Sequence, residues 1–215
     1  MDTAPVPKVA DGLIDALTSG VITITVGKED DTQATFTVHK KLFQGKAPIF
    51  NKMFGGSFLE GVTGSATLPN DDHEAFEVFM EWLYRNTLTS LALLSKSKSV
   101  NAVLRLKIAK TMVFADKYCL DELSDRAMSI WFQGRGRTLL AGELETITAY
   151  VVDNSAPTCR ARSYLARMWA KEIRSHSDGE HYKVGQSGLD TFINDDSFVT
   201  QVFNHIGALQ SFGDI

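Results

Sequence analysis

The chain has 215 residues, a formal net charge of −4 and a hydrophobic fraction of 44%. This length fits one domain, or one domain with an extension, and it suffices to bury a core without metals or disulfides. The composition excludes a wholly disordered chain, and the acidic balance argues against a dedicated nucleic-acid-binding protein, whose binding face is usually basic.

The compartment is predicted from the cysteines and from the apolar runs. Cys119 and Cys159 are too few for a disulfide scaffold, which favours two reduced thiols. Cys119, between Tyr118 and Leu120, is expected to be buried packing. No apolar run approaches the roughly 18 residues of a membrane span, and the N-terminus lacks the pattern of a signal peptide. We therefore expect an intracellular protein, cytoplasmic or nuclear or both, with no membrane partner.

Strand patterns dominate the N-terminal part. Residues 1–18 are expected to be a flexible lead-in that ends in a short helix carrying Leu13, Ile14 and Leu17. Residues 21–26 and 34–38 alternate apolar and polar side chains across a short polar connection, which predicts a hairpin. A third short strand is predicted at 65–68, stopped by Pro69.

Helical spacing takes over after Pro69. Asp71 and Glu74 form a capping-box-like start. The following apolar stripe consists of Phe76, Phe79, Met80 and Leu83. Residues 86–99 are predicted to be a polar loop. Further helices are expected at 100–117, from 121, at 143–152, at 157–174 and around 198–206. Strands and short helices followed by helices alone indicate an α+β domain with a helical tail.

Six motifs in the N-terminal part occur in a specific order. They are a strand that ends in Val26-Gly27, Phe36-Thr37-Val38-His39-Lys40-Lys41-Leu42, Pro48-Ile49-Phe50 with Met53-Phe54, Phe58-Leu59-Glu60, Phe76-x-x-Phe79-x-x-Trp82-Leu83-Tyr84, and Ala115-Asp116-Lys117-Tyr118-Cys119-Leu120. Together they resemble a BTB/POZ domain, and most closely the fungal BTB proteins with a helical C-terminal extension.

The resemblance implies a fold and a division of the chain. The fold is α+β, a small mixed sheet flanked by a helical cluster and followed by an all-α extension. Residues 19–132 are expected to form the BTB/POZ domain, and residues 138–215 an α-helical extension that is at most BACK-like. The residues expected to carry the structural signature are Phe36, His39, Phe76, Phe79, Tyr84 and Tyr118.

The resemblance also implies protein partners. In BTB adaptors of cullin-3-type RING ubiquitin ligases, an apolar-x-Glu triplet contacts the cullin. Here this implies a partner surface at Phe58, Leu59 and Glu60, with Met53. The alternative is that Phe58 packs locally and Glu60 is a solvated charge, because short motifs often match by chance. The substrate protein is not named by the sequence.

Two non-ligase functions stay open beside the adaptor. One is a BTB homo-oligomerisation scaffold, such as a homodimer, that self-associates through Leu13, Ile14 and Leu17. The other is a transcription-associated interaction protein without a ligase role. Neither implies binding of nucleic acid by this chain.

Catalytic, cofactor and metal sites are not expected. His39 follows a strand and has no nucleophile in a recognisable local motif, so a structural role is favoured. His176 to His181 is a polar segment without a second ligand pair. Gly134 to Arg137 gives thin support for phosphate binding, and Gly185 to Gly188 does not complete a nucleophile elbow. We therefore expect a non-enzymatic interaction module.

Overall fold

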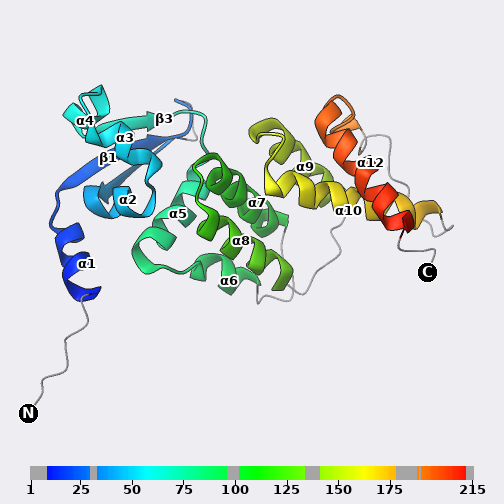
Figure 1. Ribbon diagram of the computed structural model, residues 1–215, viewed down its shortest axis with the longest axis horizontal. Helices are drawn as coiled ribbons and strands as arrows, with labels where there is room; N and C mark the ends of the chain where they lie inside the picture. The colour runs from blue at the N-terminus through cyan, green and yellow to red at the C-terminus, as the bar shows by residue number, and fades with distance from the viewer. Residues whose placement is uncertain are drawn as a thin grey trace, which may run out of the picture. The chain divides into compact units, whose positions relative to one another are not determined.

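The computed structural model describes residues 9–29, 33–95, 102–133, 141–177, 188 and 190–211 (Figure 1). The chain divides into two compact units, Met1–Thr87 and Leu88–Ile215. We call them the N-terminal unit and the C-terminal unit, and each is described by itself. The expected boundaries at 1–18, 19–132 and 138–215 remain predictions.

A three-stranded mixed sheet forms the centre of the N-terminal unit. Its strands are β1 (Val21–Val26), β2 (Ala34–His39) and β3 (Ser65–Leu68), in the order β2-β1-β3. β1 pairs antiparallel with β2, as the hairpin prediction requires, and parallel with β3. The alternation of β1 places Ile22, Ile24 and Val26 in the core.

Helices make up the rest of the described N-terminal unit. They are α1 (Val9–Leu17), α2 (Lys40–Lys46), α3 (Ile49–Gly55), α4 (Leu59–Thr63) and α5 (His73–Arg85). Phe43 of α2 lies at the centre of an aromatic cluster, with ring centroids 4.4 Å from Phe50, 6.0 Å from Phe54 and 5.8 Å from Phe79. All four of these rings are buried, so they form the core that fixes α2, α3 and α5 to one another.

The helix after β3 begins one residue later than the sequence suggested. Asp72, not Asp71, is the N-cap of α5, and its Oδ1 accepts from the Ala75 amide at 3.1 Å. Asp71 is buried, and its own amide donates to the Leu68 carbonyl in the turn after β3. Both aspartates are suitable N-cap residues, and the turn after β3 places Asp72 at the N-cap of α5.

The described part of the C-terminal unit is helical. Its helices are α6 (Thr89–Ser95), α7 (Ala102–Lys117), α8 (Asp121–Gln133), α9 (Ala141–Asn154), α10 (Arg160–Ser177) and α12 (Asp196–Ser211). The prediction of a loop over 86–99 is therefore wrong for residues 89–95. Leu88 and Leu91 are buried there, and α6 packs against α7 and α8, so tertiary burial outweighs the polar composition.

The prediction that Cys119 is buried is also wrong. Cys119 is exposed, and its φ of 54° is left-handed. The Leu120 amide donates to the Ala115 carbonyl at 2.8 Å and the Cys119 amide to the Asp116 carbonyl at 3.1 Å. This is a Schellman C-cap, in which the left-handed residue turns outward while Leu120 is buried.

The helices after α8 pack onto α7. Both α9 and α10 contact α7. Arg105 of α7 and Glu143 of α9 form an ion pair at 2.7 Å, with both side chains largely buried. On the facing surfaces of α9 and α10, the Trp169 indole donates to the Thr148 hydroxyl at 2.9 Å. The helical extension therefore shares a core with α7.

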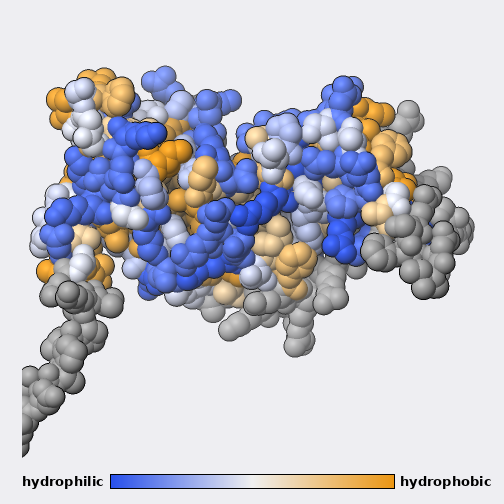
Figure 2. All heavy atoms as spheres, in the orientation of Figure 1, coloured by the Kyte–Doolittle hydropathy of each residue, from blue (hydrophilic) through white to orange (hydrophobic). Residues whose placement is uncertain are grey.

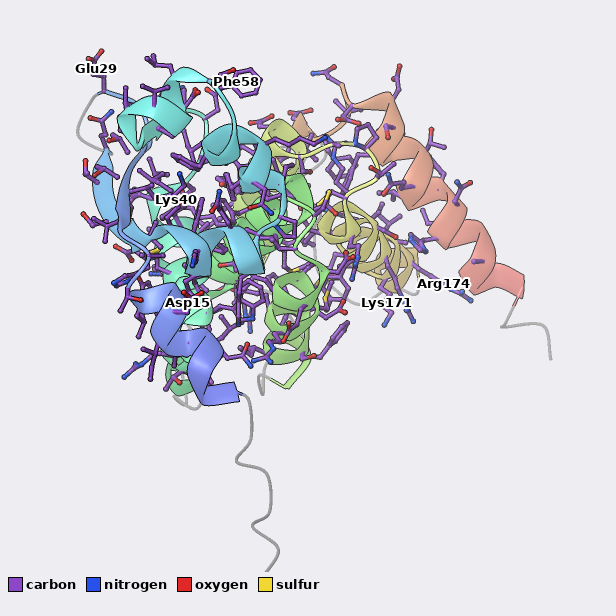
Figure 3. All side chains as sticks on the ribbon, turned by 60° about the vertical axis from the view of Figure 1, so that its left-hand side comes forward. Asp15, Glu29, Lys40, Phe58, Lys171 and Arg174 are labelled. Carbon is purple, nitrogen blue, oxygen red and sulfur yellow. The ribbon has the colours of Figure 1, made fainter. Side chains whose placement is uncertain are left out.

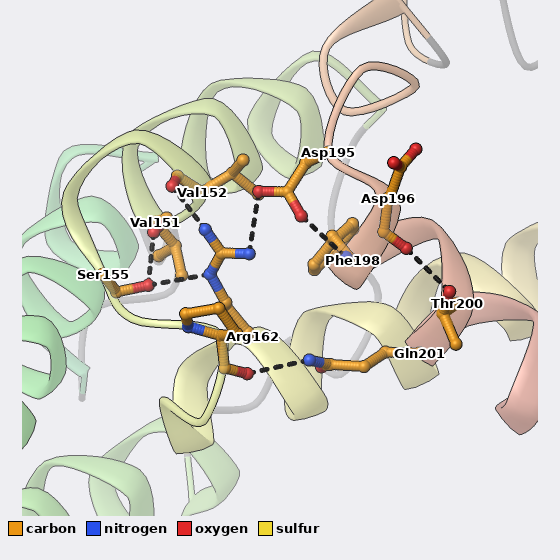
Figure 4. Close-up of polar contacts among 10 residues, drawn as sticks. Val151, Val152, Ser155, Arg162, Asp195, Asp196, Phe198, Thr200 and Gln201 are labelled. Carbon is orange, nitrogen blue, oxygen red and sulfur yellow. Dashed lines mark hydrogen bonds and ion pairs between the residues drawn. The ribbon is translucent and has the colours of Figure 1, made fainter.

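A buried arginine ties α9, α10 and α12 together (Figure 4). The Arg162 guanidinium donates to the Val152 carbonyl at 2.6 Å and to the Asp195 carboxylate at 2.9 Å, while Nε donates to the Ser155 hydroxyl at 3.2 Å. Asp195 in turn accepts from the Phe198 amide at 2.8 Å, which caps α12. The positive charge of Arg162 is thus neutralised by the Asp195 carboxylate, and its N–H groups donate to neighbouring oxygens.

Among the described residues, no helix combines the length and the apolar character needed to cross a bilayer.

Candidate functional site

The helix α4 is a single short turn held in place at both ends. The Val62 amide donates to the Phe58 carbonyl at 3.1 Å, and the Gly64 amide to the Glu60 carbonyl at 2.9 Å. Gly64 is left-handed, with a φ of 66°, and its carbonyl accepts from the Thr23 amide of β1 at 2.9 Å. The turn therefore leads directly into the parallel pairing of β1 and β3.

Close backbone contact fixes the other side of this turn. A Cβ on Gly61 would lie 2.5 Å from the Gly56 carbonyl oxygen. Only glycine allows this approach without a shift. The segment after α3 and the turn of α4 are thus in close backbone contact, which holds the five-residue helix α4 in place.

The outer face of α4 is apolar. We call Phe58, Leu59, Glu60 and Val62 the α4 surface. Phe58, Leu59 and Val62 are 63%, 74% and 76% exposed. Figure 2 shows apolar residues gathered over α4, and Figure 3 shows the Phe58 ring projecting away from the ribbon of the N-terminal unit. Such a group of exposed apolar side chains on a well-fixed turn is typical of a protein-binding surface.

Two further residues lie on the adjoining helix α3. Met53, which the sequence placed at the same surface, is half-buried. Ile49 is 44% exposed. Ile49 and Val62 were missed by the sequence analysis, although both lie inside the stretch of motifs. Glu60 is half-buried, and no cation among the described residues pairs with it.

A second apolar face lies on α1. Leu13, Ile14 and Leu17 are 50%, 62% and 39% exposed. The helix is attached to α2 by an ion pair of 2.8 Å between Asp15 and Lys41. The Lys41 amide also donates to the Ser19 hydroxyl at 3.0 Å, so α1 has a defined position while its apolar residues stay outside.

His39 lies at the junction of β2 and α2 and bonds to Tyr84 of α5. The His39 amide donates to the Tyr84 hydroxyl oxygen at 3.1 Å, and Nδ1 lies 2.8 Å from the same oxygen. The two rings meet edge to face with centroids 5.9 Å apart. This geometry gives His39 a contact across the fold, and a structural role for it remains the interpretation.

The other residues of the expected signature are aromatic. The ring centroid of Phe76 lies 4.8 Å from that of Phe36 and 5.4 Å from that of Phe79. In the C-terminal unit, the Tyr118 and Phe114 rings are 4.7 Å apart. These contacts place the aromatic residues in packing rather than in a site for chemistry.

The comparisons with known proteins address the family. The BTB/POZ domain profile matches residues 21–129, which is just over half of the chain. This chain belongs to the BTB/POZ domain family. The match begins at β1 and ends within α8, so it includes the α4 surface and α7. A search of curated proteins finds no match.

Membership in the BTB/POZ family assigns the general function. BTB/POZ domains are generally protein–protein interaction modules, which implies protein partners for this chain. The predicted fold class is confirmed, because this chain combines a BTB/POZ domain having a small mixed sheet with further helices beyond it.

The remaining candidates for chemistry can be followed only where the structure describes their residues. In the part of the chain that is described, no group of three or more His, Cys, Asp or Glu side chains is arranged to hold a metal. Gly134 to Arg137, Asp178 to His181 and Gly185 to Ser187 lie outside the described residues, as do Met1 to Lys8. Cys159 is buried, and its burial raises the pKa of the thiol.

Proposed function

We propose that this BTB/POZ protein is a substrate adaptor for a cullin-3-type RING ubiquitin ligase and works inside the cell. The observation that carries the proposal is the α4 surface. Its apolar side chains stay exposed while its backbone is fixed by Gly61 and Gly64. A fixed apolar surface binds at low entropic cost, because little ordering is needed when the partner arrives.

The chemistry of this surface fits the contact. Burying a Phe or Leu side chain that was exposed contributes about 1.5–3 kcal/mol. Phe58 and Leu59 therefore supply affinity, and Glu60 supplies a single negative charge beside them that selects a basic partner surface. The helices of the C-terminal unit beyond α8 then serve to recruit the substrate protein.

Calorimetric titration tests the proposal. The full chain is titrated with the N-terminal domain of a cullin-3-type scaffold, as wild type, Glu60→Lys and Leu59→Ala. We expect micromolar or tighter binding by the wild type and at least tenfold weaker binding by each variant, which corresponds to about 1.4 kcal/mol. Asp153→Lys makes the same charge change at an exposed position of α9 and should bind like the wild type.

The absence of heat from folded wild-type protein would remove the adaptor proposal, and equal weakening by Asp153→Lys would show only a general charge effect. Circular dichroism of every variant confirms that it is folded.

A specific observation favours a second candidate, a homo-oligomerisation scaffold. Leu13, Ile14 and Leu17 are exposed on a helix with a defined position, and such a face is suited to a second copy of the chain. Light scattering should then give a mass well above 23.7 kDa, which falls towards that value in Ile14→Glu. A wild type that stays at the monomer mass would exclude this candidate.

A further inference from the structure

The helix α10 carries a basic stripe on its outer face. Residues at i, i+4, i+7, i+11 and i+14 lie on one side of a helix. In α10 these are Arg160, Tyr164, Arg167, Lys171 and Arg174. Figure 3 shows Lys171 and Arg174 projecting from this helix. The chain as a whole is acidic, so this concentration of positive charge on one helix stands out.

The stripe lies opposite the side of α10 that packs in the unit. Ala161, Leu165, Ala166, Trp169 and Ala170 are all buried. Arg160, Arg167, Lys171 and Arg174 are all exposed. The basic residues are therefore held at fixed spacings by a helix whose other side is anchored in the core.

The first part of the stripe contacts α8. Arg160 bonds to the carboxylates of Asp121 and Asp125, which are one turn apart on α8. Tyr164 meets α8 further along, with its ring centroid 5.7 Å from Trp131 and 5.0 Å from Phe132. The residues of α8 that contact the stripe are thus two carboxylates followed by two aromatic rings.

The rest of the stripe extends past the end of α8. Helix α8 ends at Gln133, beside the ring of Tyr164. The side chains of Arg167 and Lys171 have no hydrogen bond or ion pair within the described ranges. Like charges at i and i+4 destabilise a helix slightly, and a negative partner would relieve this. Phe132, next to the last residue of α8, is 53% exposed.

We propose that the part of the stripe at Arg167 and Lys171 binds an acidic segment of a partner protein. The segment has carboxylates spaced about one helical turn apart, which pair with Arg167 and Lys171, and an apolar side chain that contacts Phe132. It continues along α10 the interaction that α8 makes with Arg160 and Tyr164. This proposal uses only residues of α8 and α10 and does not depend on the cullin contact.

An acidic peptide fits the stripe better than a nucleic acid does. From Arg160 to Arg174 the stripe is about 21 Å long at the rise of an α-helix. Binding to a nucleic-acid backbone is favoured by a basic domain, whereas this chain has a net charge of −4. Within the protein itself, the partners of Arg160 on α8 are carboxylates.

Fluorescence anisotropy with the full chain tests the proposal. The probe is a labelled 16-residue helical peptide. It has Asp or Glu along one face, at positions that repeat the spacing i, i+4 and i+7, and it contains one Trp. We expect saturable binding that weakens at least tenfold in Arg167→Glu/Lys171→Glu and weakens between 50 and 200 mM salt. Lys28→Glu/Arg85→Glu makes the same charge change at exposed residues of the N-terminal unit and should bind the peptide as the wild type does.

Three outcomes would overturn the proposal. They are no binding of the acidic peptide, equal binding of the same peptide with Gln at every acidic position, and equal binding by the double variant of α10. Tighter binding of a single-stranded RNA of equal charge would also overturn it, in favour of nucleic acid. The double variant should still bind the cullin domain like the wild type, so failure here is distinguishable from failure of the adaptor proposal.

Discussion

The hydroxyl of Tyr84 makes two hydrogen bonds to His39, 45 residues earlier in the chain. Its oxygen accepts from the His39 backbone amide, which leaves the phenolic proton free to be donated to Nδ1 when the imidazole carries its proton on Nε2. The junction of β2 and α2 is thereby fixed to the last turn of α5.

Removing this hydroxyl should destabilise the protein. In Tyr84→Phe the ring is kept, but the His39 amide and Nδ1 both lose their partner. Because the site is partly exposed, water replaces some of the lost bonding, and we expect a loss of about 1 kcal/mol in the free energy of unfolding. Urea denaturation measures the change. An unchanged midpoint would show that the two bonds contribute no stability.

A methyl group on Gly61 should disturb α4. Gly61→Ala would place a Cβ 2.5 Å from the Gly56 carbonyl oxygen, and we expect a loss of about 1–3 kcal/mol together with weaker cullin binding. Gly45→Ala is the matched control, because its added Cβ would meet no atom within 4 Å apart from its chain neighbours and its own helix backbone. Thermal unfolding of both variants provides the measurement, and equal effects of the two would contradict the close contact.

The pair of Asp195 and Arg162 should make stability depend on pH. Partial burial tends to raise the pKa of Asp195, but the hydrogen bonds from the Phe198 amide and Arg162, with the Arg162 charge, together lower it. A pKa lowered in the folded state stabilises the fold above the pH at which the unfolded carboxyl titrates, about 4. This contribution is lost as the pH falls through the lower, folded value.

Asp195→Asn should therefore lose stability at pH 7 and show a shallower decline below pH about 4 than the wild type. Urea denaturation across this range measures both effects. Asp153→Asn, at an exposed position of α9, should retain the wild-type profile. A wild-type slope in Asp195→Asn would mean that other carboxyl groups carry the acid sensitivity.

The two thiols should react at very different rates. Cys119 is exposed at the end of α7, whereas Cys159 is 1% exposed and burial raises the pKa of its thiol. Since the thiolate is the reactive form, a thiol reagent should modify Cys119 quickly and Cys159 only after unfolding. Mass spectrometry of Cys119→Ser after brief labelling should find no modified protein. Rapid labelling of Cys159 would contradict its burial.

Local patterns predicted the elements whose local and tertiary preferences agree. In β1 the residues Ile22, Ile24 and Val26 alternate with threonines, and each of them is buried. Helix α6 was missed because its burial depends on α7 and α8, which the local pattern does not contain. The orientation of Cys119 was missed for a related reason, since it depends on a left-handed backbone that few residue types signal.

The candidate surfaces were predicted in part. The triplet from Phe58 to Glu60 could be found by resemblance. The exposure of Val62 on the same turn depends on the backbone at Gly61 and Gly64, which only the structure shows. Arg162 and Asp195 are 33 residues apart, and no spacing in the sequence connects them. The basic stripe follows helical periodicity, yet the contacts of Arg160 and Tyr164 with α8 could be found only in the structure.

The ion pair between Arg105 and Glu143 has a consequence for fragments of the protein. The family match ends at residue 129, but Arg105 lies inside it and Glu143 lies beyond it. A fragment that stops at Gln133 would lose this bond and expose the surface of α7 that α9 and α10 cover. The loss of one partner from a buried pair costs about 3–5 kcal/mol. The segment that matches the family is thus shorter than the segment that completes the packing around α7.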